Sequence, residues 1–201
     1  MSDKIRKIIG GLLLVTGIVG LSSSFIISYM GEKKNKELID NFQWETVLEE
    51  PTVDFDENDN EKKNDDMFKK NVIAVINIPK VEIRYPVVKG TDANTLKKSL
   101  GYFEDTAMPG QKGNFAVAGH RNSSYAKYFN RLDEVDVGDE IIVETKEKTY
   151  TYIVDKTFKI HETETSVLDQ TEDKRITLIT CTNGYKPKYR IVVQGVLKES
   201  A

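Results

Sequence analysis

Three residues in this sequence have the types and spacing for nucleophilic chemistry. Cys181 is the only cysteine among 201 residues, and it ends an apolar run that alternates like a strand. Arg190 stands at the start of a second strand-like run, after a polar loop. If the two runs pair as a hairpin, the guanidinium lies beside the thiol. A cation there could favour the thiolate, hold a substrate carbonyl or stabilise an oxyanion.

A nucleophilic thiol also needs a proton acceptor, and the chain has two histidines. His120 ends the apolar run at residues 114–119, which predicts a position at a strand terminus. His161 lies in a charged stretch that is typical of solvated surface. We therefore select His120 as the acid/base candidate. A lone cysteine can also be a buried structural residue, but a strand end bordered by a loop favours a functional one.

Composition excludes several classes of function. The net charge of −3 gives no basis for electrostatic capture of nucleic acid. One cysteine and two histidines cannot build a disulfide framework or a dense Cys/His metal site. Five acidic residues could bind calcium, but a solvated acidic face is the expected reading, and neither metal nor cofactor is predicted. These residues are Glu104, Asp105, Asp133, Glu134 and Asp136.

The amino-terminal region predicts a membrane anchor followed by a linker. Residues 8–30 form a stretch of 23 residues without a charge, long enough to cross a bilayer as a helix. Three basic residues lie on each side of this stretch, so charge alone does not orient it. Residues 45–66 carry ten acidic residues against two lysines, which is typical of a mobile stalk. The predicted organisation is a tail (1–7), an anchor (8–30), an acidic stalk (31–66) and a folded domain (67–201).

Short strand-like runs with turn signals between them fill the folded domain. We predict two short helices, at residues 92–100 and 124–132. Eight short strands with so few helices indicate an all-β closed barrel or sandwich. The predicted strands are residues 72–78, 81–88, 114–119, 140–143, 149–155, 157–160, 176–181 and 189–197.

Together these motifs resemble the sortase family, the membrane-anchored cysteine transpeptidases of Gram-positive bacteria. The resemblance rests on Thr177-Leu178-Ile179-Thr180-Cys181, on His120 within Ala-Gly-His-Arg, on Arg190 nine residues after the cysteine, and on the anchor. It spans residues 72–197 and implies a closed eight-stranded β-barrel with its active site at one end. It also implies that Cys181 is the nucleophile, His120 the acid/base and Arg190 the substrate-orienting or oxyanion-stabilising group.

The resemblance implies a reaction and its partners. Cleavage of a Leu-Pro-x-Thr-Gly-type sorting signal between Thr and Gly would give a thioester on Cys181. An amine of the peptidoglycan cross-bridge, or of its lipid-linked precursor, would then take the acyl group. Thr180 either lines the peptide groove or is a plain strand residue. The family topology places the amino terminus in the cytoplasm and the catalytic domain outside a single-pass anchor.

Features of other subclasses are missing from the sequence, which leaves a housekeeping-like (class A) or class D-like sortase. Two other functions use the same residues or the same architecture. The first is an extracytoplasmic cysteine peptidase, with water instead of an amine as acceptor. The second is a non-catalytic wall-binding module carried on a stalk, in which Cys181 has no chemical role.

Overall fold

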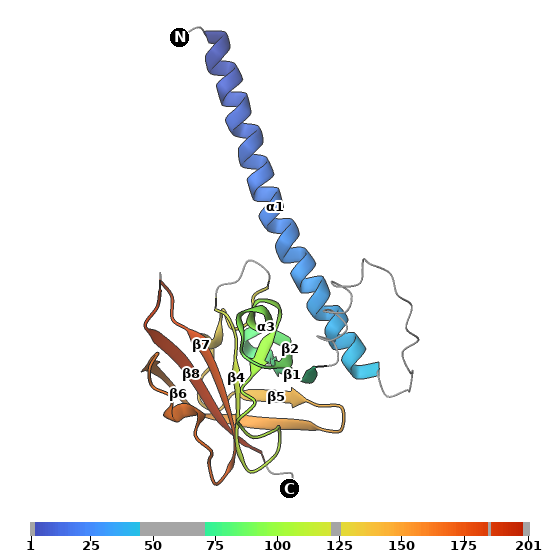
Figure 1. Cartoon of the computed structure of the whole chain (residues 1–201), viewed down its shortest axis with the longest axis vertical. Coiled ribbons are helices and arrows are strands. Elements are labelled where there is room, and N and C mark those ends of the chain that lie inside the picture. Colours follow the sequence, from blue (N-terminus) through green and yellow to red (C-terminus); the bar gives the residue numbers. More distant parts are fainter. Residues whose placement is uncertain (1–2, 45–70, 122–125, 185, 199–201) are drawn as a thin grey trace.

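The chain consists of one long helix and a β-barrel (Figure 1). The computed structural model describes residues 3–44, 71–121, 126–184 and 186–198, and within the first helix only some of the side chains. Helix α1 (Asp3–Trp44) is continuous through the predicted anchor and the first part of the predicted stalk. Among the side chains described, no helix is both long and apolar enough to span a membrane. The acidic stretch at 45–66 lies outside the described residues.

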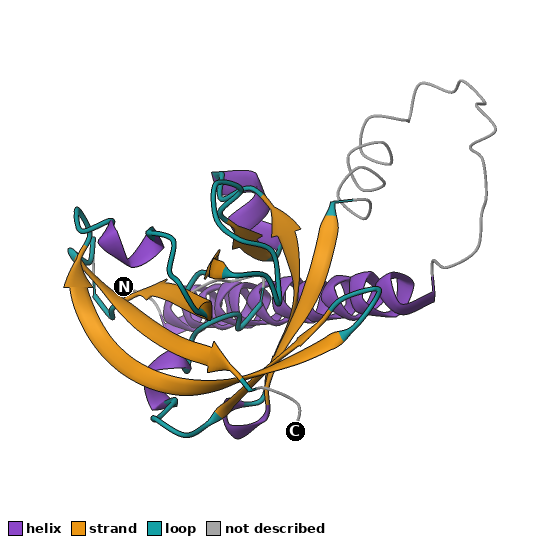
Figure 2. Cartoon of the chain, turned by 90° about the horizontal axis from the view of Figure 1, so that it is seen from below, coloured by secondary structure: helices purple, strands orange, loops and turns teal. Residues whose placement is uncertain are grey.

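Eight strands close into a barrel in the order β1-β2-β3-β4-β7-β8-β6-β5, so the predicted all-β barrel is confirmed. Most neighbours are antiparallel, but β2–β3 and β4–β7 are parallel. Figure 2 shows the strands curving around a common interior, with the short helices outside it. The strands are β1 (Val72–Ile78), β2 (Ile83–Lys89), β3 (Leu100–Tyr102), β4 (Gly113–Ala118), β5 (Glu140–Glu144), β6 (Thr149–His161), β7 (Lys174–Cys181) and β8 (Tyr189–Leu197).

Two strand predictions were wrong. Two predicted strands are one, and one strand was missed, so the predicted total of eight strands is still correct. The runs at 149–155 and 157–160 form the single strand β6, because Asp155 occupies a shift of register opposite β8 instead of a break. Strand β3 was missed because three residues containing a glycine carry no periodic signal. Its hydrogen bonds to β2 and β4 define it instead.

The helices between the strands are short. Helix α3 (Ala93–Lys98) lies within the predicted 92–100 and begins at Asp92, whose carboxylate accepts hydrogen bonds from the amides of Asn94 and Thr95. The helix predicted at 124–132 is not formed over 126–131, where the chain makes turns into the 3-10 helix η2 (Leu132–Glu134). Two further single-turn 3-10 helices are η1 (Pro79–Val81) and η3 (Ser166–Leu168).

Large apolar side chains from all parts of the barrel fill its interior. Ile76, Phe115, Tyr128, Tyr152 and Leu178 are each no more than 1% exposed. On β7 the inward-facing residues Ile176 and Leu178 belong to this core. Strand alternation therefore puts Ile179 and Cys181 on the opposite face, where both are only partly buried.

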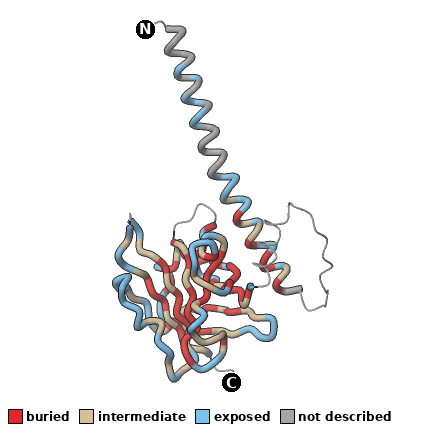
Figure 3. Tube along the Cα trace, viewed as in Figure 1, coloured by how far each residue is buried: buried red, intermediate tan, exposed pale blue. Residues whose placement is uncertain are grey.

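The carboxyl-terminal end of α1 packs against the barrel. Leu38, Ile39 and Phe42 form a second cluster with Val72 and Val88 of the neighbouring strands. Figure 3 shows buried positions on the part of α1 that lies beside the barrel. Leu13, Leu14 and Phe25, nearer the start of the helix, are exposed. Burying each such side chain contributes about 1.5–3 kcal/mol relative to exposure, so this end of the helix is held firmly on the barrel.

Candidate active site

Cys181 and Arg190 face each other across the β7–β8 pair. The register places Cys181 directly opposite Arg190, so the two side chains lie on the same face of the sheet. The preceding pair on that face is Ile179 and Val192. Cys181 is a free, partly buried thiol at the end of β7. The structure therefore places Arg190 beside Cys181, as the sequence predicted.

His120 reaches the same end of the sheet from the other side of β7. Strands β4 and β7 are parallel, and Ala118 pairs with Ile179. His120 and Cys181 each lie two residues further along their chains, so they emerge at the same level. Figure 1 shows β4, β7 and β8 as adjacent strands. The fold thus brings His120, Cys181 and Arg190 to one edge of the barrel.

Close packing fixes the backbone just before His120. The Gly119 amide donates to the carbonyl of Ile179 at 3.0 Å. The Thr180 hydroxyl donates to the carbonyl of Gly119 at 2.8 Å. A Cβ at position 119 would lie 2.6 Å from the ring of Phe129, so only glycine fits without a shift.

Thr180 therefore serves the scaffold. Its side chain is 2% exposed, and its hydroxyl is used within the fold. Of the two roles considered for Thr180, the structure favours the strand residue over a lining of the peptide groove.

Arg121 follows His120 directly and hydrogen-bonds to the loop after Cys181. It was not selected from the sequence. Its Nε donates to Asn183 Oδ1 at 2.7 Å, in the loop that follows Cys181. Its Nη2 donates to Asp133 Oδ1 at 2.8 Å, and the side chain is only 7% exposed. The sole sequence signal was adjacency to His120, since Asn183 lies 62 residues away. Arg121 thereby links the segment after the histidine to the segment after the cysteine.

The Arg190 guanidinium is held by groups on both sides. Its Nη1 donates to the carbonyls of Pro187 at 2.8 Å and Tyr189 at 3.2 Å. Its Nη2 pairs with Glu162 Oε2 at 2.9 Å. The side chain remains 27% exposed. Glu162, another residue that the sequence did not indicate, is thus positioned to orient the cation at the edge of the site.

His161 lies near the site in sequence register but on the other face. It pairs with Tyr189, one row beyond the pair of Ile160 with Arg190. Alternation along a strand therefore points His161 away from the face that carries Arg190. Its Nδ1 is 2.9 Å from the hydroxyl of Thr163, and its ring meets that of Tyr189 edge to face. The exposed His161 has no direct route to the thiol.

Comparison with known proteins identifies the family. A family model described as Sortase domain matches residues 76–198. The chain belongs to the sortase family. Its members are cysteine transpeptidases, and a free, partly buried thiol such as Cys181 is the kind of group that can serve as a nucleophile.

Similarity extends well beyond the barrel. The sortase is 32% identical to a protein named Sortase A from Listeria monocytogenes, over 98% of this chain and 93% of that protein. The structure of a Clostridium perfringens sortase D5 transpeptidase matches with a TM-score of 0.63 at 32% identity, over 86% of this chain and 100% of that one. A sortase E1 from Streptomyces coelicolor, solved with a tripeptide in its active site, matches at 30% identity and a TM-score of 0.59, over 64% and 89% of the two chains.

Ion pairs occupy several of the acidic residues considered as calcium ligands. Asp133 pairs with Arg121, Glu134 with Arg131, and Asp136 with Lys80. The hydrogen bond from Arg131 holds the pKa of Glu134 below its usual value. Within the described ranges of the sortase, no three His, Cys, Asp or Glu side chains are grouped to hold a metal ion.

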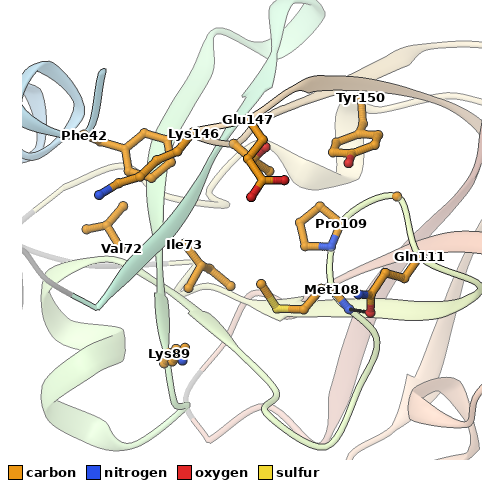
Figure 4. A pocket seen from close by; sticks show the side chains of 12 residues that line it. Phe42, Val72, Ile73, Lys89, Met108, Pro109, Gln111, Lys146, Glu147 and Tyr150 are labelled. Atoms are coloured by element: carbon orange, nitrogen blue, oxygen red, sulfur yellow. Dashed lines mark hydrogen bonds between the residues drawn. The ribbon is translucent and has the colours of Figure 1, made fainter. Parts of the chain in front are cut away.

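A pocket of about 510 Å³ lies away from the three candidate residues, where α1 meets the barrel. Figure 4 shows Phe42 of α1 on one side of it and Pro109 and Tyr150 on the other. The Lys146 ammonium lies over the Phe42 ring, 5.8 Å from its centroid. None of the three candidate residues lines this pocket, whose walls come from the junction between α1 and the barrel.

Proposed function

We propose that this sortase cleaves a peptide through a thioester on Cys181 and passes the acyl group to an amine. The Cys181 thiolate attacks the scissile carbonyl, forming the C–S bond. The C–N bond then breaks, and His120 donates its proton to the departing amine. The products of this half-reaction are an acyl-enzyme and a free amine.

The second half-reaction reverses the proton transfer. An incoming amine attacks the thioester carbonyl, His120 removes its proton, and the Cys181 thiolate leaves. Arg190 donates to the substrate carbonyl, or to the oxyanion that forms in each half-reaction. Glu162 keeps that guanidinium in place, and Thr180 supports the backbone before His120.

The proposed substrate is a Leu-Pro-x-Thr-Gly-type sorting signal, cut between Thr and Gly. The proposed acceptor is an amine of the peptidoglycan cross-bridge or of its lipid-linked precursor. A peptide substrate is supported by the S. coelicolor relative, which was solved with a tripeptide in its active site. Residues 8–30 are proposed as a single-pass anchor, with the amino terminus in the cytoplasm and the barrel outside. Support comes from the uncharged stretch within α1 and its exposed apolar side chains.

The observation that carries the proposal is the convergence of Cys181, His120 and Arg190 across three adjacent strands. The test uses the full chain in detergent with a fluorogenic Leu-Pro-x-Thr-Gly peptide. Triglycine is supplied as the amine. We expect a thioester adduct on Cys181 by mass spectrometry and a ligated product that appears only with triglycine. An adduct on another residue, or none with any sorting peptide, would overturn the proposal.

A peptidase that uses water remains the second candidate, because the same three residues would serve it. Acceptor choice depends on groove shape and water access instead of on these side chains. The same assay separates the two functions. Hydrolysis at an unchanged rate with every amine tested, and no ligated product, would favour the peptidase.

A further inference from the structure

A carboxylate on α1 contacts the segment that follows His120. Glu32 Oε1 accepts a hydrogen bond from the Tyr85 hydroxyl at 2.8 Å. The same oxygen accepts from the backbone amide of Lys127 at 3.3 Å. That amide also lies 3.2 Å from the Tyr85 hydroxyl. One residue of the long helix, 95 positions away in sequence, therefore holds an amide seven residues after the candidate acid/base.

The next residue has a backbone conformation that needs support. Tyr128 has φ +21°, which costs a non-glycine residue free energy. Its ring is fully buried and lies 5.1 Å from the ring of Tyr85, centroid to centroid. Its hydroxyl donates to the carbonyl of Lys97 at 3.0 Å. Tyr85, the partner of Glu32, is thus also one of the groups that hold Tyr128 in this conformation.

The residue after Tyr128 holds the candidate acid/base itself. The Phe129 amide donates to the carbonyl of His120 at 3.1 Å. The Phe129 ring packs against Gly119 so closely that a Cβ there would overlap it. Three consecutive residues, 127–129, therefore connect the carboxylate on α1 to the backbone on both sides of the Gly119–His120 bond.

We propose that Glu32 is a positioning residue for His120, acting through Tyr85 and residues 127–129. The proposal rests on the acid/base role proposed above for His120. It makes the docked end of α1 a working part of the active site in addition to a tether. Loss of the Glu32 oxygen frees the Lys127 amide and removes one support of the turn at Tyr128, so the imidazole spends less time in the reactive position.

The test compares full-length variants in detergent by kcat, KM and hydrogen exchange of residues 126–131. Glu32→Ala removes the acceptor, and Glu32→Gln keeps an acceptor oxygen. Tyr85→Phe removes the hydroxyl that both groups share. Asp40→Ala is the matched control, an exposed carboxylate on the same helix that makes no polar contact among the described residues.

We expect Glu32→Ala to lower kcat about 10- to 100-fold, the range that small misplacement of a catalytic group produces. KM should change less than about 2-fold, and exchange at 126–131 should rise. Glu32→Gln and Asp40→Ala should stay within about 3-fold of wild type, and Tyr85→Phe should fall between.

Wild-type kcat in both Glu32→Ala and Tyr85→Phe would overturn the inference, as would a loss in Glu32→Gln equal to that in Glu32→Ala. Exchange across β7 and β8 shows whether each variant is folded, and Tyr85→Phe decides if Glu32→Ala is not. His120→Ala separates the two proposals. If it retains activity, the proposed function fails. If it is inactive while Glu32→Ala is fully active, only the inference fails.

Discussion

Both histidines of this chain lie at or just beyond the end of a strand, but their structural settings differ. His120 follows β4, which lies next to the strand of Cys181, and His161 ends β6, two strands away from it. His120 is surrounded by constraints: packing at Gly119, a backbone bond from Phe129 and the neighbouring Arg121 pairs. His161 is exposed, and its contacts are the Thr163 hydroxyl and the edge of Tyr189.

The difference is the structural reason for proposing His120, and not His161, as the acid/base. A position near the nucleophile in register is not enough, because one step along a strand reverses the face to which the side chain points. A catalytic histidine also needs a backbone that is held in a fixed position. Packing at Gly119 and the bond from Phe129 fix the backbone at His120, whereas at His161 the paired backbone of β6 carries an exposed side chain.

The largest effect is expected from removing each histidine in turn. His120→Ala should lower transpeptidation by about 10³-fold or more, because the leaving amine loses its proton donor. His161→Ala should remain within about 2-fold of wild type. Steady-state kinetics with the sorting peptide and triglycine measures both. A dispensable His120 beside an essential His161 would reverse the comparison.

The next largest effect is expected from removing the positive charge of Arg190. Arg190→Ala should lower kcat/KM about 10²- to 10³-fold, as loss of an oxyanion donor does in other enzymes. Glu162→Gln is the matched variant, since it weakens the ion pair but leaves the guanidinium in the site. It should cost less than about 10-fold. Equal losses in the two variants would mean that the ion pair, and not the cation, is what matters.

A smaller effect is expected from the Arg121 link on the His120 side. Arg121→Ala leaves Asp133 and Asn183 without their partner, so it should lower kcat about 10-fold and stability by about 1–3 kcal/mol. Arg175→Ala is the control at the other end of β7, where a similarly buried arginine pairs with Asp155 and Asp173.

The control should lose stability without losing kcat. Urea unfolding gives the stability of each variant, and the peptide assay gives kcat. If Arg175→Ala lowers kcat as much as Arg121→Ala, the effect reflects general loosening of β7 and not a link between the two loops.

The smallest effect is expected in the pH dependence of stability. It tests whether the Tyr85 hydroxyl supports the segment that follows His120. Burial, and then the hydrogen bond to Glu32, raise the pKa of Tyr85 far above its usual value. A raised pKa in the folded state means that this stabilisation is complete below about pH 10 and is lost as the pH rises toward the folded value.

Unfolding free energies of wild type and Tyr85→Phe should therefore converge with a slope of at most about 1.4 kcal/mol per pH unit above pH 10. The buried Tyr152, whose pKa is raised to about 12, contributes equally to both proteins. A constant difference between the two proteins from pH 8 to 11 would contradict the assignment.

The sequence predicted the parts of the site that depend on nearest-neighbour pairing. The bounds of β1 and β8 agree with the expected runs, and the hairpin spacing correctly placed Arg190 beside Cys181. Such features follow from alternation and loop length, which a single sequence contains.

Contacts between distant segments could not be predicted in the same way. The partners of Arg121, Arg190 and Glu32 lie 62, 28 and 95 residues away, and any of several polar residues would have been an equal choice. Tertiary packing selects among them. The same reason explains β3, whose three residues form a strand only because β2 and β4 flank them.

If residues 8–30 span a bilayer, as proposed, the unbroken course of α1 would also determine how the enzyme meets its substrates. The helix has 42 residues, about 60 Å at 1.5 Å per residue, and its last turns are packed on the barrel. With residues 8–30 in a bilayer, as proposed, no hinge among the helical residues lets the barrel swivel. The catalytic edge would then stand at a constant height and tilt above the lipid headgroups. Secreted chains would have to deliver their cleavage motif to that height, instead of being sought by a freely tumbling domain.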